Sequence, residues 1–145
     1  MTDDVKRVPV AEAKRLLDEE GYTYLDVRTE AEYAGGHPVG ARNVPLMHAG
    51  AGGMKLNLEF LAAMEANYPQ DTKLVVGCKA GGRSLEAAKQ LIAAGYTQII
   101  DMHPGWGGKR NAFGQVTEPG WQAAGLPTEM TTELGSYEDH QAKLG

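Results

Sequence analysis

An apolar run, a glycine-rich loop and a helix-forming segment follow one another between residues 73 and 95, and this succession constrains the fold more than any other feature. Residues 73–77 form a short apolar run, which is typical of a strand buried on both faces of a parallel sheet. From Ser84 the composition predicts a helix that stops at Gly95. Its apolar face is expected to comprise Leu85, Ala88 and Ile92. A strand that leads through a loop into a helix is the repeating unit of α/β folds.

The same alternation continues on both sides of this unit. Thr29 and Glu32 have the Thr-x-x-Glu spacing of a capping box, which predicts a short helix. The other expected strands are residues 22–27 and 97–100, and the other expected helices are residues 11–20 and 56–68, with a flexible loop at residues 48–53. Strands that alternate with helices predict an α/β fold with a mainly parallel central sheet flanked by helices.

The length of the chain predicts one main domain. The 145 residues, of which 42% are hydrophobic, are enough for a core that folds alone. We expect this domain over residues 1–127. Residues 128–145 are polar with a surplus of acid, and we expect a C-terminal tail or a peripheral helix there.

Charge and composition exclude several kinds of partner. The net charge of −5 at pH 7 argues against a general affinity for nucleic acids or anionic membranes. No apolar run approaches the ~20 residues that span a membrane, and residues 1–4 lack the order of a signal peptide. We therefore expect the chain in the cytoplasm, or in a soluble organelle compartment after processing. The histidines and the cysteine show no zinc-type spacing, so no metal and no cofactor are expected.

Cys78 opens the glycine-rich loop and is the only cysteine of the chain. Ligands of parallel sheets bind beyond the carboxyl ends of the strands, which is where this loop begins. Gly81 and Gly82 allow the amide N–H groups of the loop to point inward, and the following helix adds the positive end of its dipole. Lys79 and Arg83 reinforce the positive field. The loop therefore favours a thiolate nucleophile, the alternative being an inert core thiol in a tight turn.

Three segments resemble, in order, the signature segments of rhodanese domains. Residues 78–84, Cys-Lys-Ala-Gly-Gly-Arg-Ser, are similar to the active-site loop of that family, whose pattern is Cys-x-x-Gly-x-Arg-Ser. Residues 121–127, Trp-Gln-Ala-Ala-Gly-Leu-Pro, are similar to its closing Trp-x-x-x-Gly-Leu-Pro. The upstream signature resembles Leu25-Asp26-Val27-Arg28, Glu32-Tyr33, Gly36-His37, Gly40-Ala41 and Asn43-Val44-Pro45. The likeness is greatest to the single-domain rhodanese proteins of plants and bacteria, including the senescence-associated type.

The resemblance implies a rhodanese-like fold and a thiosulfate sulfurtransferase that works through a persulfide. Cys78 would be the catalytic residue and would attack the outer sulfur of a donor such as thiosulfate, releasing sulfite. Cyanide, a thiol or an acceptor protein would then take the sulfur. The expected substrate-binding residues are Lys79, Ala80, Gly81, Gly82, Arg83 and Ser84.

The resemblance also places supporting residues beside the loop. Asp26 is expected to pair with Arg83 or with N–H groups of the loop, the alternative being a plain strand-end salt bridge. Arg28 is either part of the site or a surface charge. His37 either serves the site or binds backbone as a structural histidine. Glu32 is expected to cap a helix rather than to act as an acid.

Other classes of function share this fold. Phosphatases and arsenate reductases place one more residue between Cys and Arg than the four found between Cys78 and Arg83, and the longer loop holds a tetrahedral oxyanion. A non-catalytic recognition module is a second class, although such modules often lack the cysteine. A sulfur carrier that serves a partner protein would use the same chemistry as the enzyme.

The segment between Asp101 and Trp121 departs from the rhodanese pattern, in which a Gly-Gly pair lies a few residues before the closing Trp. Here residues 107–108 lie far upstream, and residues 104–106 are another candidate for the same position, so an insertion is expected. Because the strand at residues 97–100 should run parallel to the strand before Cys78, the insertion should leave on the side of the Cys78 loop. It would be either a passive loop or a flap that narrows the mouth of the site and adds positive charge.

Overall fold

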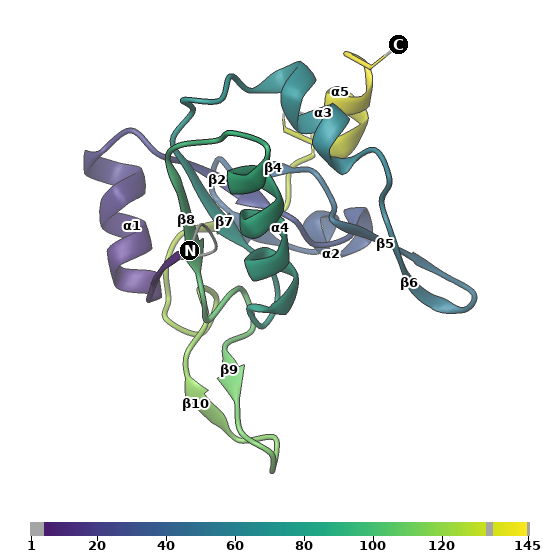
Figure 1. Cartoon of the computed structure of the whole chain (residues 1–145). Helices are drawn as coiled ribbons and strands as arrows, with labels where there is room; N and C mark the ends of the chain where they lie inside the picture. Colours follow the sequence, from purple (N-terminus) through teal and green to yellow (C-terminus); the bar gives the residue numbers. More distant parts are fainter. Residues whose placement is uncertain (1–4, 133–134, 145) are drawn as a thin grey trace.

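A five-stranded parallel sheet forms the centre of the computed structural model, which describes residues 5–132 and 135–144 (Figure 1). The strand order is β1-β8-β7-β2-β4, and every neighbouring pair is parallel. These strands are β1 (Lys6–Val8), β2 (Thr23–Asp26), β4 (Arg42–Asn43), β7 (Leu74–Gly77) and β8 (Ile99–Met102). The predicted α/β class with a mainly parallel sheet is confirmed.

Helices cover both faces of this sheet (Figure 1). They are α1 (Val10–Glu19), α2 (Glu30–Ala34), α3 (Phe60–Asn67), α4 (Gly82–Ala93) and α5 (Tyr137–Gln141). Along β7, Leu74 and Val76 belong to the core cluster beneath α3 and α4, whereas Val75 belongs to the cluster beneath α1. Both faces of β7 are therefore buried, which explains why this strand is a continuous apolar run.

The predicted helix at residues 56–68 is wrong in its first turn. β5 (Met47–Gly50) and β6 (Gly53–Leu56) form an antiparallel hairpin where a flexible loop was expected, and Leu58 is 91% exposed. Asn57 sets the change of structure, because its backbone N–H binds the Leu46 carbonyl and its side-chain oxygen accepts from the N–H of Glu59. α3 therefore begins at Phe60.

The predicted buried face of α4 is also partly wrong. Its buried residues are Ser84, Ala87, Ala88 and Leu91, whereas Leu85 and Ile92 are only partly buried. The buried face therefore consists of three small side chains and Leu91, and Leu85 and Ile92 lie at its flanks.

The C-terminal segment packs against the rest of the chain where it is described. β11 (Thr128–Glu129) pairs antiparallel with β3 (His37–Pro38), and α5 lies against α3. Tyr137 of α5 belongs to the core cluster of α3 and α4. Residues 1–4, on which the expectation about a signal peptide rests, lie outside the described residues, as do residues 133–134 and 145. Within the described part, no helix is long and apolar enough to cross a membrane.

The expected insertion is a second hairpin. β9 (Lys109–Arg110) pairs antiparallel with β10 (Val116–Glu118), and the hairpin extends away from the body of the domain beyond β8 (Figure 1). It is a formed element rather than an irregular loop.

Candidate active site

The loop that holds Cys78 joins the carboxyl end of β7 to the first turn of α4. Gly81 caps the helix in the left-handed region, with φ 99°, which favours glycine. A Cβ atom at this position would lie 2.4 Å from the carbonyl oxygen of His103. Both the backbone angle and the lack of space therefore require a glycine here.

The sulfur of Cys78 is buried between the Gly81 N–H and the Ser84 hydroxyl. Cys78 is only 2% exposed, and the N–H of Gly81 donates to its Sγ at 3.0 Å. The Sγ in turn donates to the Ser84 hydroxyl oxygen at 3.4 Å. The first turn of α4 also presents unpaired N–H groups and the positive end of the helix dipole. This geometry can hold a thiolate or a persulfide anion.

The six loop residues expected to bind substrate differ in exposure. Gly81 and Ser84 are buried beside the sulfur, whereas Lys79, Ala80 and Gly82 are exposed. Arg83 binds Glu32 through two contacts, with Nη1–Oε1 at 2.7 Å and Nη2–Oε2 at 3.1 Å. The expected pairing of Asp26 with Arg83 is therefore wrong.

Asp26 instead pairs with Arg28. The Arg28 Nη2 donates to Asp26 Oδ2 at 2.7 Å, and the backbone N–H of Arg28 donates to Oδ1 at 3.0 Å. The alternative of a strand-end salt bridge is the one observed, although this pair is buried. Burial lowers the pKa of Arg28, but the hydrogen bonds to Asp26 outweigh it and raise the pKa above its ordinary value.

Arg28 is not a surface charge. Its guanidinium donates to the Gly36 carbonyl at 2.6 Å and lies 4.9 Å from the ring centroid of Trp106. A cation over an indole face at this distance is favourable. Arg28 therefore ties β2, the loop before His37 and the segment after β8 together.

Glu32 caps α2, as predicted, and also has a second role. It forms a complete capping box with Thr29, and the same carboxylate binds Arg83. Burial raises the pKa of Glu32, but the hydrogen bonds from Arg83 and Thr29 outweigh it and lower the pKa to about 2. The bond to Arg83 joins residues 51 positions apart, which the Thr-x-x-Glu pattern does not indicate.

His37 has the contacts of a structural histidine. Its Nδ1 lies 2.7 Å from the Tyr33 carbonyl oxygen, and its ring stacks on that of Tyr33 at 3.7 Å. The Nε2 lies 3.5 Å from a carboxylate oxygen of Glu129 in β11. These contacts fix the start of β3 against β11.

Arg7 and Asp101, which no sequence pattern indicates, also support the Cys78 loop. The Nε of Arg7 donates to Asp101 at 2.7 Å, and its Nη2 donates to the Gly81 carbonyl at 3.3 Å. Asp101 is fully buried, and this burial raises its pKa, although hydrogen bonds from Ser84 and Arg7 oppose the shift. Arg7 and Asp101 lie 94 positions apart, so no local pattern could reveal their contact.

The segment after β8 lies directly against the Cys78 loop, as the parallel pairing of β7 and β8 predicts. The Trp106 N–H donates to the Cys78 carbonyl at 2.7 Å, and the Gly107 N–H donates to the Lys79 carbonyl at 2.8 Å. Gly107, taken from the sequence as part of the insertion, therefore belongs to the scaffold of the loop. The hairpin begins only at Lys109.

The fold and the site together define an α/β protein whose single cysteine lies in a strand–loop–helix turn at the carboxyl edge of a parallel sheet. The chain belongs to the rhodanese-like domain family, whose family model matches residues 9–111. This assignment confirms the resemblance found in the sequence.

Known proteins agree with this assignment. The chain is 39% identical over 109 residues to Thiosulfate sulfurtransferase 16, chloroplastic, of Arabidopsis thaliana, a match that covers 75% of this chain and 81% of that protein. It is 39% identical over 99 residues to Senescence-associated protein DIN1 of Raphanus sativus, which covers 68% of this chain and 54% of that protein. Among solved structures, Rv0390 from M. tuberculosis superimposes with a TM-score of 0.71 at 27% identity, covering 88% of this chain and 98% of that one.

Proposed function

We propose that this protein is a sulfurtransferase that carries a sulfane sulfur as a persulfide on Cys78. The observation that carries the proposal is the Gly81 N–H, which donates to the Cys78 Sγ at 3.0 Å at the start of α4. An N–H group in this position stabilises a sulfur anion before and after sulfur is attached. The relative named as a thiosulfate sulfurtransferase supports the same activity.

The proposed first step uses thiosulfate as the donor. The Cys78 thiolate attacks the outer sulfur of thiosulfate, and a new S–S bond forms on the enzyme. The S–S bond of the donor breaks, and its electron pair leaves with sulfite. One thiolate and one dianion give one persulfide anion and one dianion, so charge and atoms balance. Lys79 is exposed beside the loop and supplies positive charge for the approaching dianion.

The proposed second step regenerates the Cys78 thiolate. Cyanide or an acceptor thiolate attacks the outer sulfur of the persulfide, the S–S bond breaks, and the electron pair stays on Cys78. The products are thiocyanate or an acceptor persulfide. The buried pair of Asp26 and Arg28 is linked to the loop through Trp106, whose ring lies against the Arg28 guanidinium and whose N–H donates to the Cys78 carbonyl. The proposed setting is a reducing compartment, the cytoplasm or a soluble organelle compartment, because the thiol must stay reduced.

Loop size argues against phosphatase or arsenate reductase activity. Four residues separate Cys78 from Arg83, and the guanidinium of Arg83 is bound to Glu32 rather than directed at the sulfur. A tetrahedral oxyanion would need a wider cradle and a free guanidinium.

The test is the intact mass of the purified protein after incubation with thiosulfate. We expect a gain of one sulfur atom, located on Cys78 by peptide mapping and removed by cyanide with release of thiocyanate. Protein whose Cys78 has been alkylated beforehand is the control and should gain none. An aryl phosphate and 3-mercaptopyruvate are assayed in parallel, and thiosulfate is expected to be preferred. No gain of sulfur, or turnover of the aryl phosphate comparable with that of thiosulfate, would contradict the proposal.

A further inference from the structure

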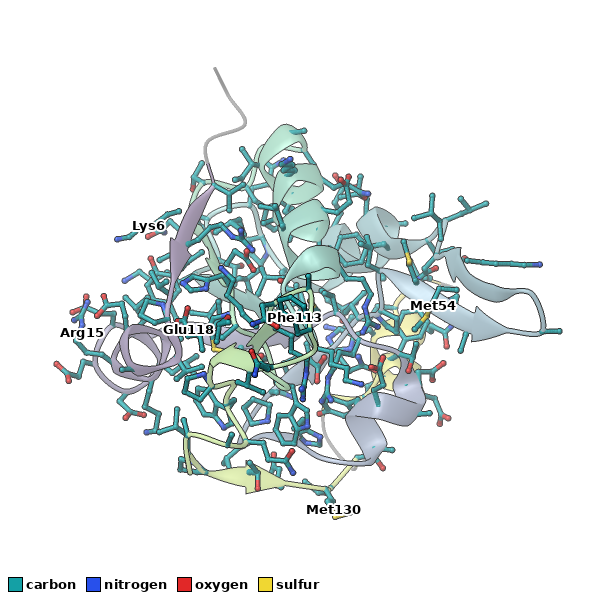
Figure 2. The ribbon with its side chains drawn as sticks, turned by 90° about the horizontal axis from the view of Figure 1, so that it is seen from below. Lys6, Arg15, Met54, Phe113, Glu118 and Met130 are labelled. Carbon is teal, nitrogen blue, oxygen red and sulfur yellow. The ribbon has the colours of Figure 1, made fainter. Side chains whose placement is uncertain are left out.

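The β9–β10 hairpin presents a large aromatic side chain to solvent. Phe113 lies at its tip and is 88% exposed. In Figure 2, which looks onto the side of the domain from which the hairpin extends, Phe113 lies near the centre of the view and Met130 at its edge. Such a side chain contributes nothing to the core, and exposed aromatic residues are enriched where proteins bind one another.

The tip is held in one shape by its own hydrogen bonds. The side-chain oxygen of Asn111 accepts from the N–H of Phe113 at 2.9 Å and from the N–H of Gln115 at 3.1 Å. Arg110 Nη1 donates to the Gly114 carbonyl at 2.9 Å. Phe113 is therefore displayed by a formed turn, and little conformational entropy is lost when a partner binds it.

The base of the hairpin is joined to the loop of the reactive cysteine. The Gly107 N–H binds the Lys79 carbonyl, and a Cβ atom on Gly107 would lie 3.3 Å from Cγ of Lys79. Cys78 is 2% exposed, so an acceptor must bring its thiol to the loop itself. A protein that reaches Cys78 is then close enough to contact the hairpin.

Unpaired positive charge surrounds this approach. Lys79, Lys109 and Arg110 are all exposed. None of the ion pairs formed within residues 5–132 and 135–144 involves any of these three. The chain as a whole carries −5, so these three unpaired cations are opposite in sign to the net charge of the protein. Positive charge of this kind attracts an acidic surface.

We propose that the β9–β10 hairpin is a docking element for an acceptor protein that presents a cysteine thiol within an acidic surface and an apolar site for Phe113. This proposal rests on the proposed function. The acceptor thiolate attacks the outer sulfur of the Cys78 persulfide, the S–S bond of the persulfide breaks, and its electron pair returns to Cys78. The acceptor leaves as a persulfide anion, so atoms and charge balance.

A second copy of this chain is a less suitable partner for the hairpin than an acidic acceptor protein. A two-fold symmetric contact brings the same surface of both copies together. Lys109 and Arg110 of one copy would then face those of the other, and like charges at a contact are unfavourable. An acidic partner meets the same residues with the opposite sign.

The test compares two peptide acceptors, each with one cysteine. One peptide has leucines and glutamates around the cysteine, and the other has lysines in place of the glutamates. At low salt we expect transfer from persulfide-loaded protein to the acidic peptide to be about tenfold faster than to the basic one, and this ratio to fall as salt screens the charges. Phe113→Ala should slow transfer to the acidic peptide about fivefold. Met130→Ala, which also removes an exposed apolar side chain, should not.

Two further measurements separate docking from chemistry. Transfer from thiosulfate to cyanide needs no docking, so Phe113→Ala should leave it within about twofold of wild type. If this assay fails in the wild type, the proposed function fails. Binding of a fluorescent acidic peptide with serine in place of cysteine, measured by anisotropy, tests docking without sulfur transfer. Replacement of residues 111–115 by Asn-Gly, which keeps a two-residue hairpin turn, should weaken this binding as Phe113→Ala does.

Two results would overturn the proposal. One is equal transfer to the acidic and basic peptides, together with unchanged binding in both hairpin variants. The other is a dimer, detected by sedimentation equilibrium, that Phe113→Ala converts to a monomer while transfer to the peptides stays unchanged. The hairpin would then bind a second copy of this chain rather than an acceptor protein.

Discussion

Asp26 and Arg28 stand two residues apart at the end of β2 and form a buried ion pair, with Nη2 2.7 Å from Oδ2. The guanidinium continues to the Gly36 carbonyl and to the face of Trp106. The charge of Arg28 is therefore balanced inside the domain, and Trp106, on whose ring it lies, donates its backbone N–H to the Cys78 carbonyl.

Arg28→Met is expected to lower the free energy of unfolding by about 3 kcal/mol, because it leaves the carboxylate of Asp26 buried without its partner. Urea unfolding near neutral pH measures this loss. The double variant Asp26→Asn/Arg28→Met should lose less than the two single losses added together, since no uncompensated charge remains. Strict additivity would mean that the two side chains are not coupled.

Cys78→Ser is expected to abolish transfer from thiosulfate to cyanide, with at least a thousandfold loss of kcat/KM, because the nucleophile is gone. The swap nearly keeps the volume, and the serine hydroxyl can accept from the same Gly81 N–H. The melting temperature should therefore stay within a few degrees of wild type. Substantial transfer by the folded variant would refute a persulfide on Cys78.

Asp101→Asn tests whether Asp101 of β8 supports the Cys78 loop through Arg7. The variant keeps the shape but loses the charge that binds Arg7, so we expect a loss of about 2 kcal/mol in unfolding free energy. We also expect kcat for sulfur transfer to fall about tenfold, because Arg7 no longer fixes the Gly81 carbonyl. Lys6→Ala, which removes a positive charge next to Arg7 in β1, is the control. Loss of stability with an unchanged kcat would limit Asp101 to a purely structural role.

Glu32→Gln tests the dependence of stability on pH. The pKa of Glu32 is lowered from 4.5 to about 2 in the folded protein, so its charge stabilises the fold above about pH 4.5, and this stabilisation is lost as the pH falls toward 2. The glutamine variant should be less stable at neutral pH, and its difference from wild type should shrink in acid. Urea unfolding at several pH values measures both curves. A difference that stays constant in acid would show that the charge of Glu32 is not responsible.

Much of this architecture could be predicted because it depends on local patterns. The apolar run at β7 indicates burial on both faces, and the spacing of Thr29 and Glu32 indicates the capping box. The order of strands and helices then predicts a parallel sheet, and the parallel pairing of β7 and β8 predicts the side on which the chain leaves Met102.

The contacts that complete the site could not be predicted, because they join distant parts of the chain. From the sequence, Asp26 could pair with either Arg28 or Arg83. The sequence alone does not show that Arg83 pairs with Glu32 and that Arg28 pairs with Asp26. Arg7 precedes the first helix in a segment without any motif. Its partner is defined only when β1 pairs with β8.

Backbone hydrogen bonds from Trp106 and Gly107 to the carbonyls of Cys78 and Lys79 fix the base of the hairpin to the Cys78 loop. The hairpin itself contributes little to the core, since residues 109–117 are all exposed. Under the proposed function, partner choice and sulfur chemistry therefore belong to separate parts of the chain. We therefore expect that a different hairpin can be transplanted between Lys109 and Glu118 to change the acceptor while the Cys78 loop keeps its shape.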